Sequence, residues 1–589
     1  MHNPHTFYSR QLLDHQSSVK ELKKQLLRLS MLRLAIFMFT IIGIYFSYKN
    51  WQTATIIGIA GTAIFLYLLS KYTDIKRQRD LQKSLVLINE NEIKIASGDF
   101  HDRFDGKQYL DSKHYYSLDI DLFGKGSFFQ FINRTIIPEA SQLLANNLTA
   151  NNIQDIEARQ KAIKELGSMP EWRQFYTATA SLVQVETEAK TVIKWLNNYD
   201  SIFKNWMRYL PYAFSFLSIG FIILSFLEIV NSNWVFYWLL FGLVVTGVYL
   251  KRINHLALNT DKVKDTFRQY ALLLYQIENK VFEAELLQSK QQKIQSNTLK
   301  ASTIFTQLSK SLDALDNRNN IFSAIIGNGF FLTDIKNSFR IEQWISEHGH
   351  KVSDWFEVVS FFDAYNSLGN YVFNHPDYVF PKIASSKQAI SAKGLGHPLL
   401  NKTKRVSSDL EINNQEFFIV TGANMAGKST FLRTVSLHIV MANVGLPVCA
   451  NESVYNPVKL ITSMRTSDSL TDDSSYFFSE LTRLKFIVDE IGKEPYFIVL
   501  DEILKGTNST DKAIGSRKFV EKLVATNATG IIATHDLSLC EIETQLEPVK
   551  NYYFDAQIVN DELFFDYKLK QGICQNMNAS FLLNKMDII

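Results

Sequence analysis

The sequence predicts a multidomain protein, with an α/β domain at its C-terminal end, a mostly α-helical region before it, and four transmembrane helices in two hairpins. Three observations predict this class. Long apolar runs occur in two pairs, apolar residues recur at helical spacing between them, and strands alternate with helices from about residue 396 onward. A chain of 589 residues is long enough to hold several domains.

Four apolar runs carry no charged residue. The first pair is Leu34–Tyr48 with Ala54–Leu69, and the second is Tyr212–Leu227 with Trp234–Leu250. Once flanking residues are included, each run reaches the length of a membrane-spanning helix, for which ~17–20 mostly apolar residues suffice. We therefore predict two transmembrane hairpins, called hairpin 1 and hairpin 2. The alternative is two buried helical hairpins in a large soluble core.

Basic residues gather at the open ends of both hairpins, whereas the two turns contain only one of them, Lys49. The flanking basic residues are Lys23, Lys24, Arg28, Arg33, Lys71, Lys76, Arg77 and Arg79 for hairpin 1, and Lys204, Arg208, Lys251 and Arg252 for hairpin 2. Under the positive-inside rule, the open ends face the cytoplasm. We therefore expect a multi-pass protein of the inner (cytoplasmic) membrane, with its N-terminus and its α/β domain on the cytoplasmic side.

The remaining stretches divide by pattern. Ile153–Leu166 and Asp354–Phe373 have helical spacing, residues 253–320 are expected to form one long helix, and prolines and glycines between 376 and 396 mark a linker. The predicted segments are an N-terminal helix (1–30), hairpin 1 (31–71), a helical core region (72–205), hairpin 2 (206–252), a helical lever with the return of the core (253–395) and the α/β domain (396–589).

Composition narrows the choice of partners only slightly. Lysine and arginine number 62 against 59 aspartate and glutamate residues, a formal charge of +3. This balance does not predict nucleic-acid binding, although it leaves room for a local basic face. The three cysteines, Cys449, Cys540 and Cys574, match neither a zinc site nor a disulfide framework, so we predict packing residues in a reducing compartment.

One stretch has the pattern of a phosphate-binding loop. The apolar strand Glu416–Val420 leads into Thr421–Thr430, which reads TGANMAGKST, and a helix is predicted over Phe431–Asn443. G-x-x-x-x-G-K-S between a strand and a helix is the P-loop pattern. The predicted nucleotide-binding residues are Gly422, Ala423, Asn424, Met425, Ala426, Gly427, Lys428, Ser429 and Thr430.

Each part of this loop has a physical purpose. Gly422 and Gly427 let the backbone wrap a phosphate chain with its N–H groups pointing inward, and the helix N-terminus adds positive potential. Lys428 supplies a charge for the β- and γ-phosphates, and the Ser429 hydroxyl is a ligand for Mg²⁺. The sequence therefore predicts ATP and Mg²⁺ as ligands.

Two further strands are expected to end beside this loop. Tyr496–Leu500 ends in Asp501-Glu502, and Gly530–Ala533 is followed by Thr534-His535. The C-terminal ends of parallel strands meet at one edge of a sheet. We expect Asp501 to support Mg²⁺, Glu502 to orient and deprotonate the attacking water, and His535 to contact the γ-phosphate or that water. Together these residues predict an ATP hydrolase of the P-loop type.

An Asn-Met pair lies inside the loop, and Phe431-Leu432-Arg433 follows it. This combination resembles the phosphate loop of the MutS family of DNA mismatch-repair ATPases, so the α/β domain is expected to be of the ABC/MutS-like class. Further stretches resemble that family's ATPase motifs: Gly396–Leu399 resembles the opening motif, and Ala533–His535 resembles the histidine switch. The Walker B region is resembled by Asp501-Glu502, Gly506-Thr507 and Asp511. The signature stretch is resembled by Ser467–Glu480, in which Ser475 occupies the position of the serine that reaches across a dimer.

The resemblance extends upstream and also has gaps. The stretches that look like the MutS helical core are Ser117–Asp119, Asn133–Thr135, Ile156–Leu166, Phe362-Asp363 and Ser367-Leu368. Ala423 replaces the usual proline, and Asp472 and Asp473 stand where small residues normally precede the signature serine, where their charges would repel ATP unless turned away. We find no room for the family's mismatch-reading domain, and hairpin 2 occupies the place of its DNA clamp.

The resemblance implies a homodimer that closes its ATPase domains around two ATP molecules, with Ser475 acting in trans. It also implies ATP-dependent DNA binding related to mismatch repair or damage sensing. The alternative is a membrane-tethered mechanochemical ATPase that acts on a protein or lipid without DNA. Lys280, Lys290 and Lys293 are candidates for phosphate contacts or simply a solvated helix face. A single-chain ABC transporter is a third alternative, but the runs contain no internal charged or broken helix to line a path.

Overall fold

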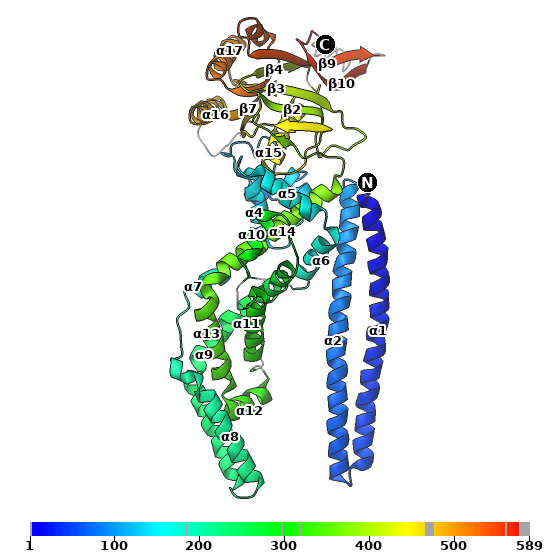
Figure 1. The fold of residues 1–589 in the computed structure, drawn as a ribbon, viewed down its shortest axis with the longest axis vertical. Coiled ribbons are helices and arrows are strands. Elements are labelled where there is room, and N and C mark those ends of the chain that lie inside the picture. Colours follow the sequence, from blue (N-terminus) through cyan, green and yellow to red (C-terminus); the bar gives the residue numbers. More distant parts are fainter. Residues whose placement is uncertain are drawn as a thin grey trace.

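The computed structural model describes residues 3–183, 185, 187–295, 299–316, 318, 320–423, 425–465, 476–559 and 562–575. The molecule is elongated, with the α/β domain at one end and two helical hairpins at the other (Figure 1). A helical core lies between them. Both hairpins project from the core in the same direction, so their turns lie together at the end farthest from the α/β domain.

Hairpin 1 consists of two long, continuous helices. α1 spans Pro4–Ser47 and α2 spans Trp51–Ala96, and the side chains of Asn3 and Asn50 cap their N-termini. A helix of 44 residues is about 66 Å long, roughly twice the ~30 Å of a bilayer core. The apolar half of each helix therefore lies at the turn of the hairpin, and the polar half continues to the helical core (Figure 1). The predicted segment boundaries at residues 30 and 71 lie inside these helices.

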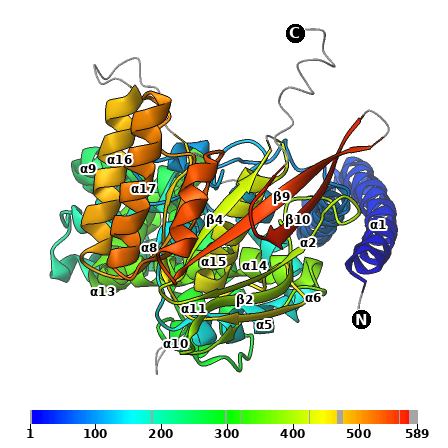
Figure 2. The same ribbon diagram turned by 90° about the horizontal axis from the view of Figure 1, so that it is seen from above.

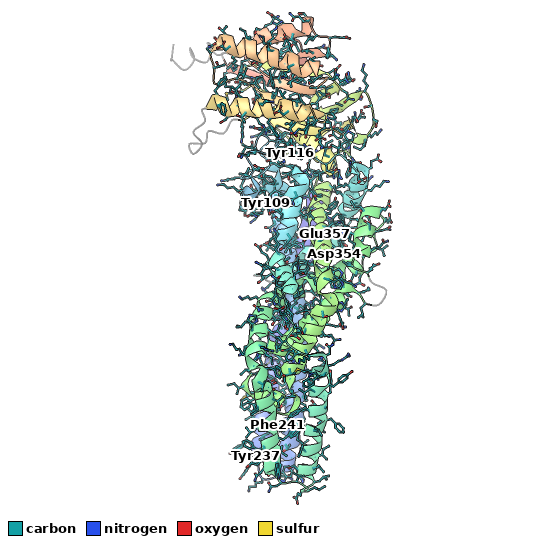
Figure 3. The ribbon with its side chains drawn as sticks, turned by 90° about the vertical axis from the view of Figure 1, so that its left-hand side faces the viewer. Tyr109, Tyr116, Tyr237, Phe241, Asp354 and Glu357 are labelled. Atoms are coloured by element: carbon teal, nitrogen blue, oxygen red, sulfur yellow. The ribbon has the colours of Figure 1, made fainter. Side chains whose placement is uncertain are left out.

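Hairpin 2 is built in the same way. A 3₁₀ turn, Asn205–Arg208, precedes α8 (Leu210–Phe226), and α9 runs unbroken over Ser232–Glu278. Helices α1, α2, α9 and the segment Asn205–Phe226 are long and apolar enough to cross a membrane, judged by length and composition. Figure 3 shows Tyr237 and Phe241 of α9 near the distal end, with Asp354 and Glu357 closer to the α/β domain.

The apolar side chains of these helices are largely exposed. Phe46, Phe216 and Phe226 keep 79%, 78% and 88% of their surface open. At the base of hairpin 1, the Arg33 guanidinium lies 4.7 Å from the centre of the Tyr72 ring, which places a cation–aromatic pair where the apolar stretch ends. Exposed apolar surface of this extent is unusual for a monomeric soluble protein and marks a surface for contact with a membrane or with another protein.

The single long helix expected over residues 253–320 is wrong. α9 ends at Glu278, and two separate helices follow, α10 (Glu285–Gln292) and α11 (Ala301–Asp316). The chain turns because the carboxylate of Glu165, on another helix, accepts hydrogen bonds from the backbone N–H groups of Glu283 and Ala284 at 2.8 and 2.6 Å. α11 then packs against α9, where Lys264 pairs with Asp316.

A short apolar helix that the sequence analysis did not identify, α12 (Ile321–Phe331), packs against hairpin 2. Its exposed side chains include Ile321 and Phe322, at 71% and 80%. It meets α9 through two glycines, because a Cβ on Gly242 would lie 2.2 Å from the carbonyl oxygen of Gly329. Small residues of this kind let apolar helices approach closely.

The helical core surrounds α14 (Val352–Asn374), which confirms the helix predicted over Asp354–Phe373. Asp363 accepts hydrogen bonds from the N–H groups of Ile136 and Ile137, and Ser367 accepts one from the N–H of Arg134. Burial raises the pKa of Asp363 to about 7. The other core elements are η1 (Lys107–Tyr109), α3 (Phe128–Ile132), α4 (Pro138–Thr149), α5 (Ile156–Gly167), α6 (Pro170–Ala180), α7 (Ala189–Asn197), α13 (Thr333–His348) and η4 (Gly349–Lys351).

The α/β domain is built on a six-stranded sheet with the order β10-β9-β4-β8-β7-β6, parallel except for the β9–β10 pair. Its elements are β4 (Phe417–Gly422), α15 (Lys428–Val444), β6 (Lys459–Ser463), α16 (Tyr476–Ile491), β7 (Tyr496–Asp501), α17 (Ser509–Ala525), β8 (Thr529–Ala533), η5 (Leu537–Thr544), β9 (Val549–Val559) and β10 (Glu562–Gln571). This confirms the predicted strands that end near residues 420, 500 and 533.

The two faces of this sheet are covered by different helices (Figure 2). Alternate residues of a strand point to opposite faces. Accordingly, Phe418 and Val420 belong to the core that contains α15, whereas Phe417 and Ile419 pack with α16 and α17. A second sheet, of order β1-β5-β2-β3, contains β1 (Lys382–Ile383), β2 (Gln388–Leu395), β3 (Ser408–Asn413) and β5 (Glu452–Tyr455). All three cysteines are buried, which confirms their predicted packing role.

The glycine contact between α9 and α12 leads to a first prediction. Gly242→Leu should force α12 away from hairpin 2, because the new side chain cannot fit against Gly329. We expect a loss of roughly 1–3 kcal/mol, the usual cost of overpacking, seen as a lower melting temperature in detergent. Gly247→Leu is the matched control on the same helix, since its Cβ meets no described atom within 4 Å. Equal melting temperatures for both variants would contradict this packing.

Candidate functional site

The predicted site residues meet at one edge of the six-stranded sheet. β4, β8 and β7 are neighbours, and their C-terminal ends carry Gly422, His535 and Asp501 respectively. Asp501 is in register with Ala533, and the N–H of Glu502 donates to the carbonyl of Ala533 at 2.9 Å. Sheet register alone therefore brings together residues up to 113 positions apart in the sequence.

The loop between β4 and α15 requires glycine at both ends. Gly427, with φ of 105°, immediately precedes α15, and Gly422 has φ of 148°. A Cβ on Gly422 would also lie 2.7 Å from the carbonyl oxygen of Phe554. Other residues rarely adopt these angles. Inside the loop, Ala423 and Ala426 are buried, whereas Met425 is 79% exposed. Thr430, in the first turn of α15, is also exposed.

Lys428, the first residue of α15, is buried and bends back over the loop. Its ammonium donates to the carbonyls of Gly422 and Ala423 at 2.9 and 3.0 Å. Burial lowers its pKa, although the nearby carboxylates of Glu502 and Asp501 favour the charged form. The loop thus holds a desolvated positive charge at the end of the sheet, which suits a polyphosphate.

Ser429 and Asp501 form a direct pair. The Ser429 hydroxyl donates to Oδ2 of Asp501 at 2.6 Å. A hydroxyl and a carboxylate at this spacing are oxygen donors of the type that Mg²⁺ prefers. The two residues assigned to the metal from the sequence are therefore adjacent, and they fit an ion that is held mainly by phosphates.

Glu502 and His535 form a second pair. Nε2 of His535 lies 2.8 Å from Oε1 of Glu502 and 3.2 Å from Nζ of Lys428. One ring nitrogen cannot donate to the carboxylate and accept from the ammonium at the same time, so the tautomer decides which contact is a hydrogen bond. The contact with His535, aided by Lys505, lowers the pKa of Glu502 to about 2. Glu502 is therefore an ionised carboxylate at neutral pH.

A further residue organises this site. Glu480 of α16 is buried, and its carboxylate accepts hydrogen bonds from the N–H groups of Leu504 and Lys505 at 2.5 and 3.0 Å. These contacts hold the loop after Glu502, where Glu502 and Leu504 themselves have positive φ angles of 51° and 60°. Glu480 is the last residue of the signature-like stretch in the sequence. No sequence pattern predicts its positioning role, because Glu480 lies 22 positions before Glu502.

Other predicted residues lie outside the described part of the chain. Asn424 falls on an undescribed position in the loop, and Ser475, Asp472 and Asp473 belong to the undescribed segment 466–475. The structure therefore places the phosphate loop, both carboxylates and His535 together, and it leaves the role of Ser475 as a prediction.

The site is connected directly to the helical core. Asp119 accepts hydrogen bonds from the Thr462 hydroxyl at 2.5 Å and from the N–H of Arg465 at 2.8 Å. Nε of Arg433, on α15, donates to the carbonyl of Asp119 at 3.2 Å, and Arg465 donates to the Asp121 carboxylate through Nη1 and Nη2. The core segment Asp119–Asp121 thus contacts both α15, which follows the phosphate loop, and the chain at the end of β6.

Comparison with known proteins supports the resemblance of this part of the chain. Residues 418–583 match the family model of MutS domain V. The human MutS protein homolog 4 is 31% identical over 249 residues, which cover 40% of this chain and 26% of that protein. The DNA mismatch repair protein MutS of Methanococcoides burtonii is 30% identical over 252 residues, covering 41% and 28%. The chain thus spans about a quarter of the length of these relatives.

The contacts of Glu480 generate a second prediction. Glu480→Ala should leave two buried N–H groups without partners, which costs roughly 1–3 kcal/mol for each such group. We expect a lower melting temperature and a reduced rate of ATP hydrolysis, because the loop after Glu502 loses its support. ATP affinity should change little, since the phosphate loop is untouched. Asp489→Ala on the same helix is the control, because Asp489 is partly exposed and pairs with exposed Lys485 rather than with the loop after Glu502. An unchanged hydrolysis rate in Glu480→Ala would refute the positioning role.

Proposed function

We propose that this chain is a membrane-anchored ATPase of the MutS type, which transmits the ATP cycle through its helical core to hairpin 2. The observation that carries the proposal is the convergence of Lys428, Ser429, Asp501, Glu502 and His535 at the ends of three adjacent strands. This arrangement has the parts of a P-loop hydrolase, and the relatives' family supports the same chemistry.

In this proposal, the N–H groups of the loop and Lys428 bind the phosphates of ATP. Ser429 and Asp501 hold Mg²⁺, which supplies charge neutralisation on the phosphates when bound. Glu502 is ionised, so it can accept a proton from the attacking water, and His535 orients it at 2.8 Å. The chain acts as a homodimer through its ATPase domains, with Ser475 contributing to the site of the partner.

The exposed apolar helices support the membrane anchor. Hairpin 1 and hairpin 2 point the same way, and their turns lie at the same end of the molecule (Figure 1), so both can enter one bilayer. The exposed face of α12 adds apolar surface beside hairpin 2. The α/β domain then stands away from the membrane, on the cytoplasmic side of the inner membrane by the positive-inside rule.

Motion at the site has a continuous route to the apolar end. Asp119 contacts both Arg433 and Arg465 next to the phosphate loop and the signature region. α9 is a single helix of 47 residues, about 70 Å long, that begins in the apolar hairpin and ends in the buried core. A rotation of the core would therefore be carried to hairpin 2 as a rigid-body movement.

DNA binding is the second candidate function, and the names of the relatives, which include DNA mismatch repair proteins, favour it. The helical lever, residues 253–395, offers less support for DNA binding. Lys290 pairs with Glu357 at 2.8 Å and lies over the Phe361 ring, and Lys293 approaches the same carboxylate at 3.9 Å. These contacts favour the solvated helix face over phosphate contacts for both lysines. The geometry therefore favours the membrane-coupled ATPase.

Glu502→Gln tests both functions in one protein. It should bind ATP normally but hydrolyse it ~10²–10⁴-fold more slowly, because it removes the general base. Binding of matched, mismatched and branched duplexes to this detergent-purified variant, with and without ATP and across a salt series, then separates the candidates. We expect only weak nonspecific binding, ~10⁻⁴–10⁻⁶ M at physiological salt.

Lys428→Ala, which should lose ATP binding itself, is the control for ATP dependence. Tight binding of any duplex that responds to ATP in Glu502→Gln but not in Lys428→Ala would make DNA the partner instead. Normal hydrolysis by Glu502→Gln would overturn the proposed chemistry.

The membrane topology can be measured with single cysteines, since the chain's own three are buried. Lys49→Cys and Ser232→Cys, at the two hairpin turns, should react with an impermeant maleimide in right-side-out vesicles. Lys485→Cys on exposed α16 should react only in inside-out vesicles. Labelling of all three positions from one side would refute the anchor.

A further inference from the structure

A group of basic side chains lies beside hairpin 2, at the level where its apolar part begins. Two of them, Lys336 and Arg340, belong to α13, which follows α12 and packs against α8. The third, Arg208, is the last residue of the 3₁₀ turn before α8. All three lie around one aromatic side chain, Tyr212, in the first turn of α8. The flanks of the apolar run identify Arg208 in the sequence, but they do not include the two residues of α13.

The contacts to Tyr212 define this group. Nζ of Lys336 lies 5.1 Å from the centre of the Tyr212 ring, and Nη2 of Arg340 donates to the Tyr212 hydroxyl at 3.3 Å. Arg208 is near enough for its charge to act on the same hydroxyl. Lys336 and Arg340 are four positions apart on α13, so they lie on the same face of that helix. We call Arg208, Tyr212, Lys336 and Arg340 the basic cluster.

No carboxylate of the described chain forms an ion pair with this cluster. The 3₁₀ turn and α8 contain no acidic residue, and the three acidic residues of α13 are engaged or distant. Asp334 pairs with Arg318 at 3.5 Å, and Glu342 accepts four hydrogen bonds from the segment before the 3₁₀ turn. Glu347 lies two turns beyond Arg340. The basic cluster therefore keeps a formal charge of +3.

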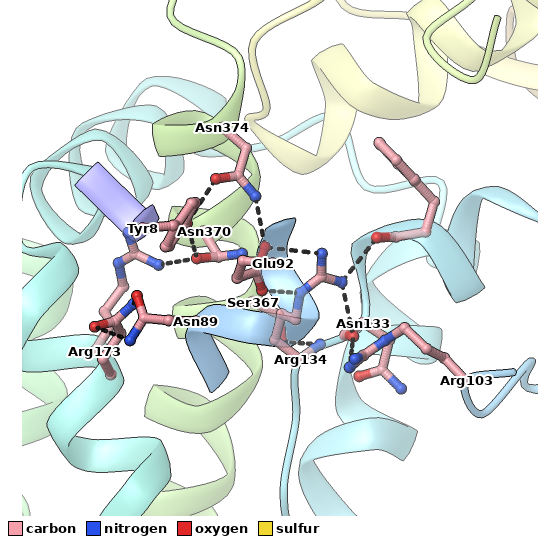
Figure 4. Close-up of polar contacts among 12 residues, drawn as sticks. Tyr8, Asn89, Glu92, Arg103, Asn133, Arg134, Arg173, Ser367, Asn370 and Asn374 are labelled. Atoms are coloured by element: carbon pink, nitrogen blue, oxygen red, sulfur yellow. Dashed lines mark hydrogen bonds and ion pairs between the residues drawn. The ribbon is translucent and has the colours of Figure 1, made fainter. Parts of the chain in front are cut away.

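The base of hairpin 1 shows the opposite arrangement (Figure 4). There Arg134 donates to both oxygens of the buried Glu92 carboxylate, so its charge is neutralised within the chain. In the basic cluster, Arg208 and Arg340 are exposed and Lys336 is half-buried. The charged groups of the cluster are thus open to a partner of opposite charge.

The surface next to the cluster is apolar. From Tyr212 onward, exposed apolar residues follow at helical spacing on the same face of α8, toward the hairpin turn: Phe216, Ile219 and Ile223. On the side of α13, the exposed apolar helix α12 ends at Phe331, five positions before Lys336. Positive charge and apolar surface therefore meet within one or two helical turns. The boundary between a bilayer and water has this character, and aromatic residues gather there.

This boundary selects the class of partner. A nucleic acid carries its charges along its whole length, whereas the cations here are bounded by apolar surface on the side of the hairpin. A phospholipid matches both features, because its headgroup carries the phosphate and its acyl chains cover the apolar face. Guanidinium and ammonium groups bind phosphate oxygens. Basic groups on the cytoplasmic side of membrane helices attract anionic headgroups in particular.

We propose that the basic cluster binds the headgroup of an anionic phospholipid, such as phosphatidylglycerol, in the cytoplasmic leaflet. This inference rests on the membrane anchoring proposed for hairpin 2. The headgroup would contact Lys336 and Arg340 from one side and Arg208 from the other, over the ring of Tyr212. Because α13 belongs to the core and α8 to the hairpin, a bound headgroup would join the two and fix how deeply hairpin 2 enters the bilayer.

The test measures the thermal stability of the full chain in a nonionic detergent while short-chain lipids are titrated. Dioctanoyl phosphatidylglycerol is the anionic probe, and dioctanoyl phosphatidylcholine, which has the same chains but no net charge, is the comparison. We expect a saturable rise of about 1–3 °C with the anionic lipid and no saturable rise with the other. No rise with the anionic lipid, or equal rises with both, would overturn the proposal.

A matched pair of variants separates a defined site from general attraction. Arg340→Gln should raise the half-saturating concentration of the anionic lipid roughly tenfold or more, the loss expected for one charge-assisted hydrogen bond. Arg252→Gln is the control, because Arg252 is exposed just past the apolar run of α9 and makes no described contact with Tyr212. It removes the same charge from the same hairpin, and its half-saturating concentration should change little. Equal weakening in both variants would refute a defined site.

Lys336→Gln repeats the test if Arg340→Gln fails to fold, and the same weakening is expected. Two further probes separate the sources of a phosphate group. Glycerol 3-phosphate presents a phosphate without acyl chains, and a short DNA duplex presents phosphates without an apolar part. Neither should produce a rise that depends on Arg340. A rise of that kind at the concentrations used for the lipid would make the ligand a soluble phosphate or a nucleic acid and overturn the lipid assignment.

The labelling of single cysteines at the hairpin turns tests the anchor separately. If the turns react as expected but the anionic lipid has no effect, the lipid site is wrong and the membrane anchor stands. If all positions react from one side, the anchor is wrong and the lipid site is wrong with it.

Discussion

The base of hairpin 1 and the helical core are held together by the buried polar side chains of α14. Asn370 accepts hydrogen bonds from Arg173 and from the Tyr8 hydroxyl, and Asn374 donates to Glu92, so this helix fixes the base of hairpin 1. One turn and two turns earlier, Ser367 and Asp363 bind the backbone before α4. Each of these groups would cost roughly 1–3 kcal/mol if it were buried without its partner. α14 therefore resists sliding, and the core is expected to move as a unit.

This constraint connects two surfaces of opposite character. At one end, a desolvated lysine and two carboxylates meet where parallel strands end, because β4, β8 and β7 are neighbours in the sheet. At the other end, apolar helices keep most of their surface exposed. Long, unbroken helices separate the two, so a charged site and a nonpolar surface coexist without either desolvating the other.

Much of the site could be predicted from the sequence. Gly422, Lys428 and Ser429 form a local pattern, and the strands that carry Asp501 and His535 are short apolar runs with clear ends. Glu480 was missed as a positioning residue because its partners are backbone N–H groups, which leave no mark on the sequence. α12 was missed because its 11 residues are too few to read as a span. The break after Glu278 was missed because Glu165, far upstream, stabilises it.

The sequence by itself determined the periodicity, the apolar runs and the order of the motifs, since these depend on neighbouring residues. It therefore sufficed for the four apolar helices and the phosphate loop. Only the tertiary structure decided that both hairpins point the same way, that Asp119 contacts Arg433 and Arg465, and that Lys336 and Arg340 lie against Tyr212. These features depend on distances between residues far apart in the chain, and a distance of that kind is set by packing rather than by local pattern.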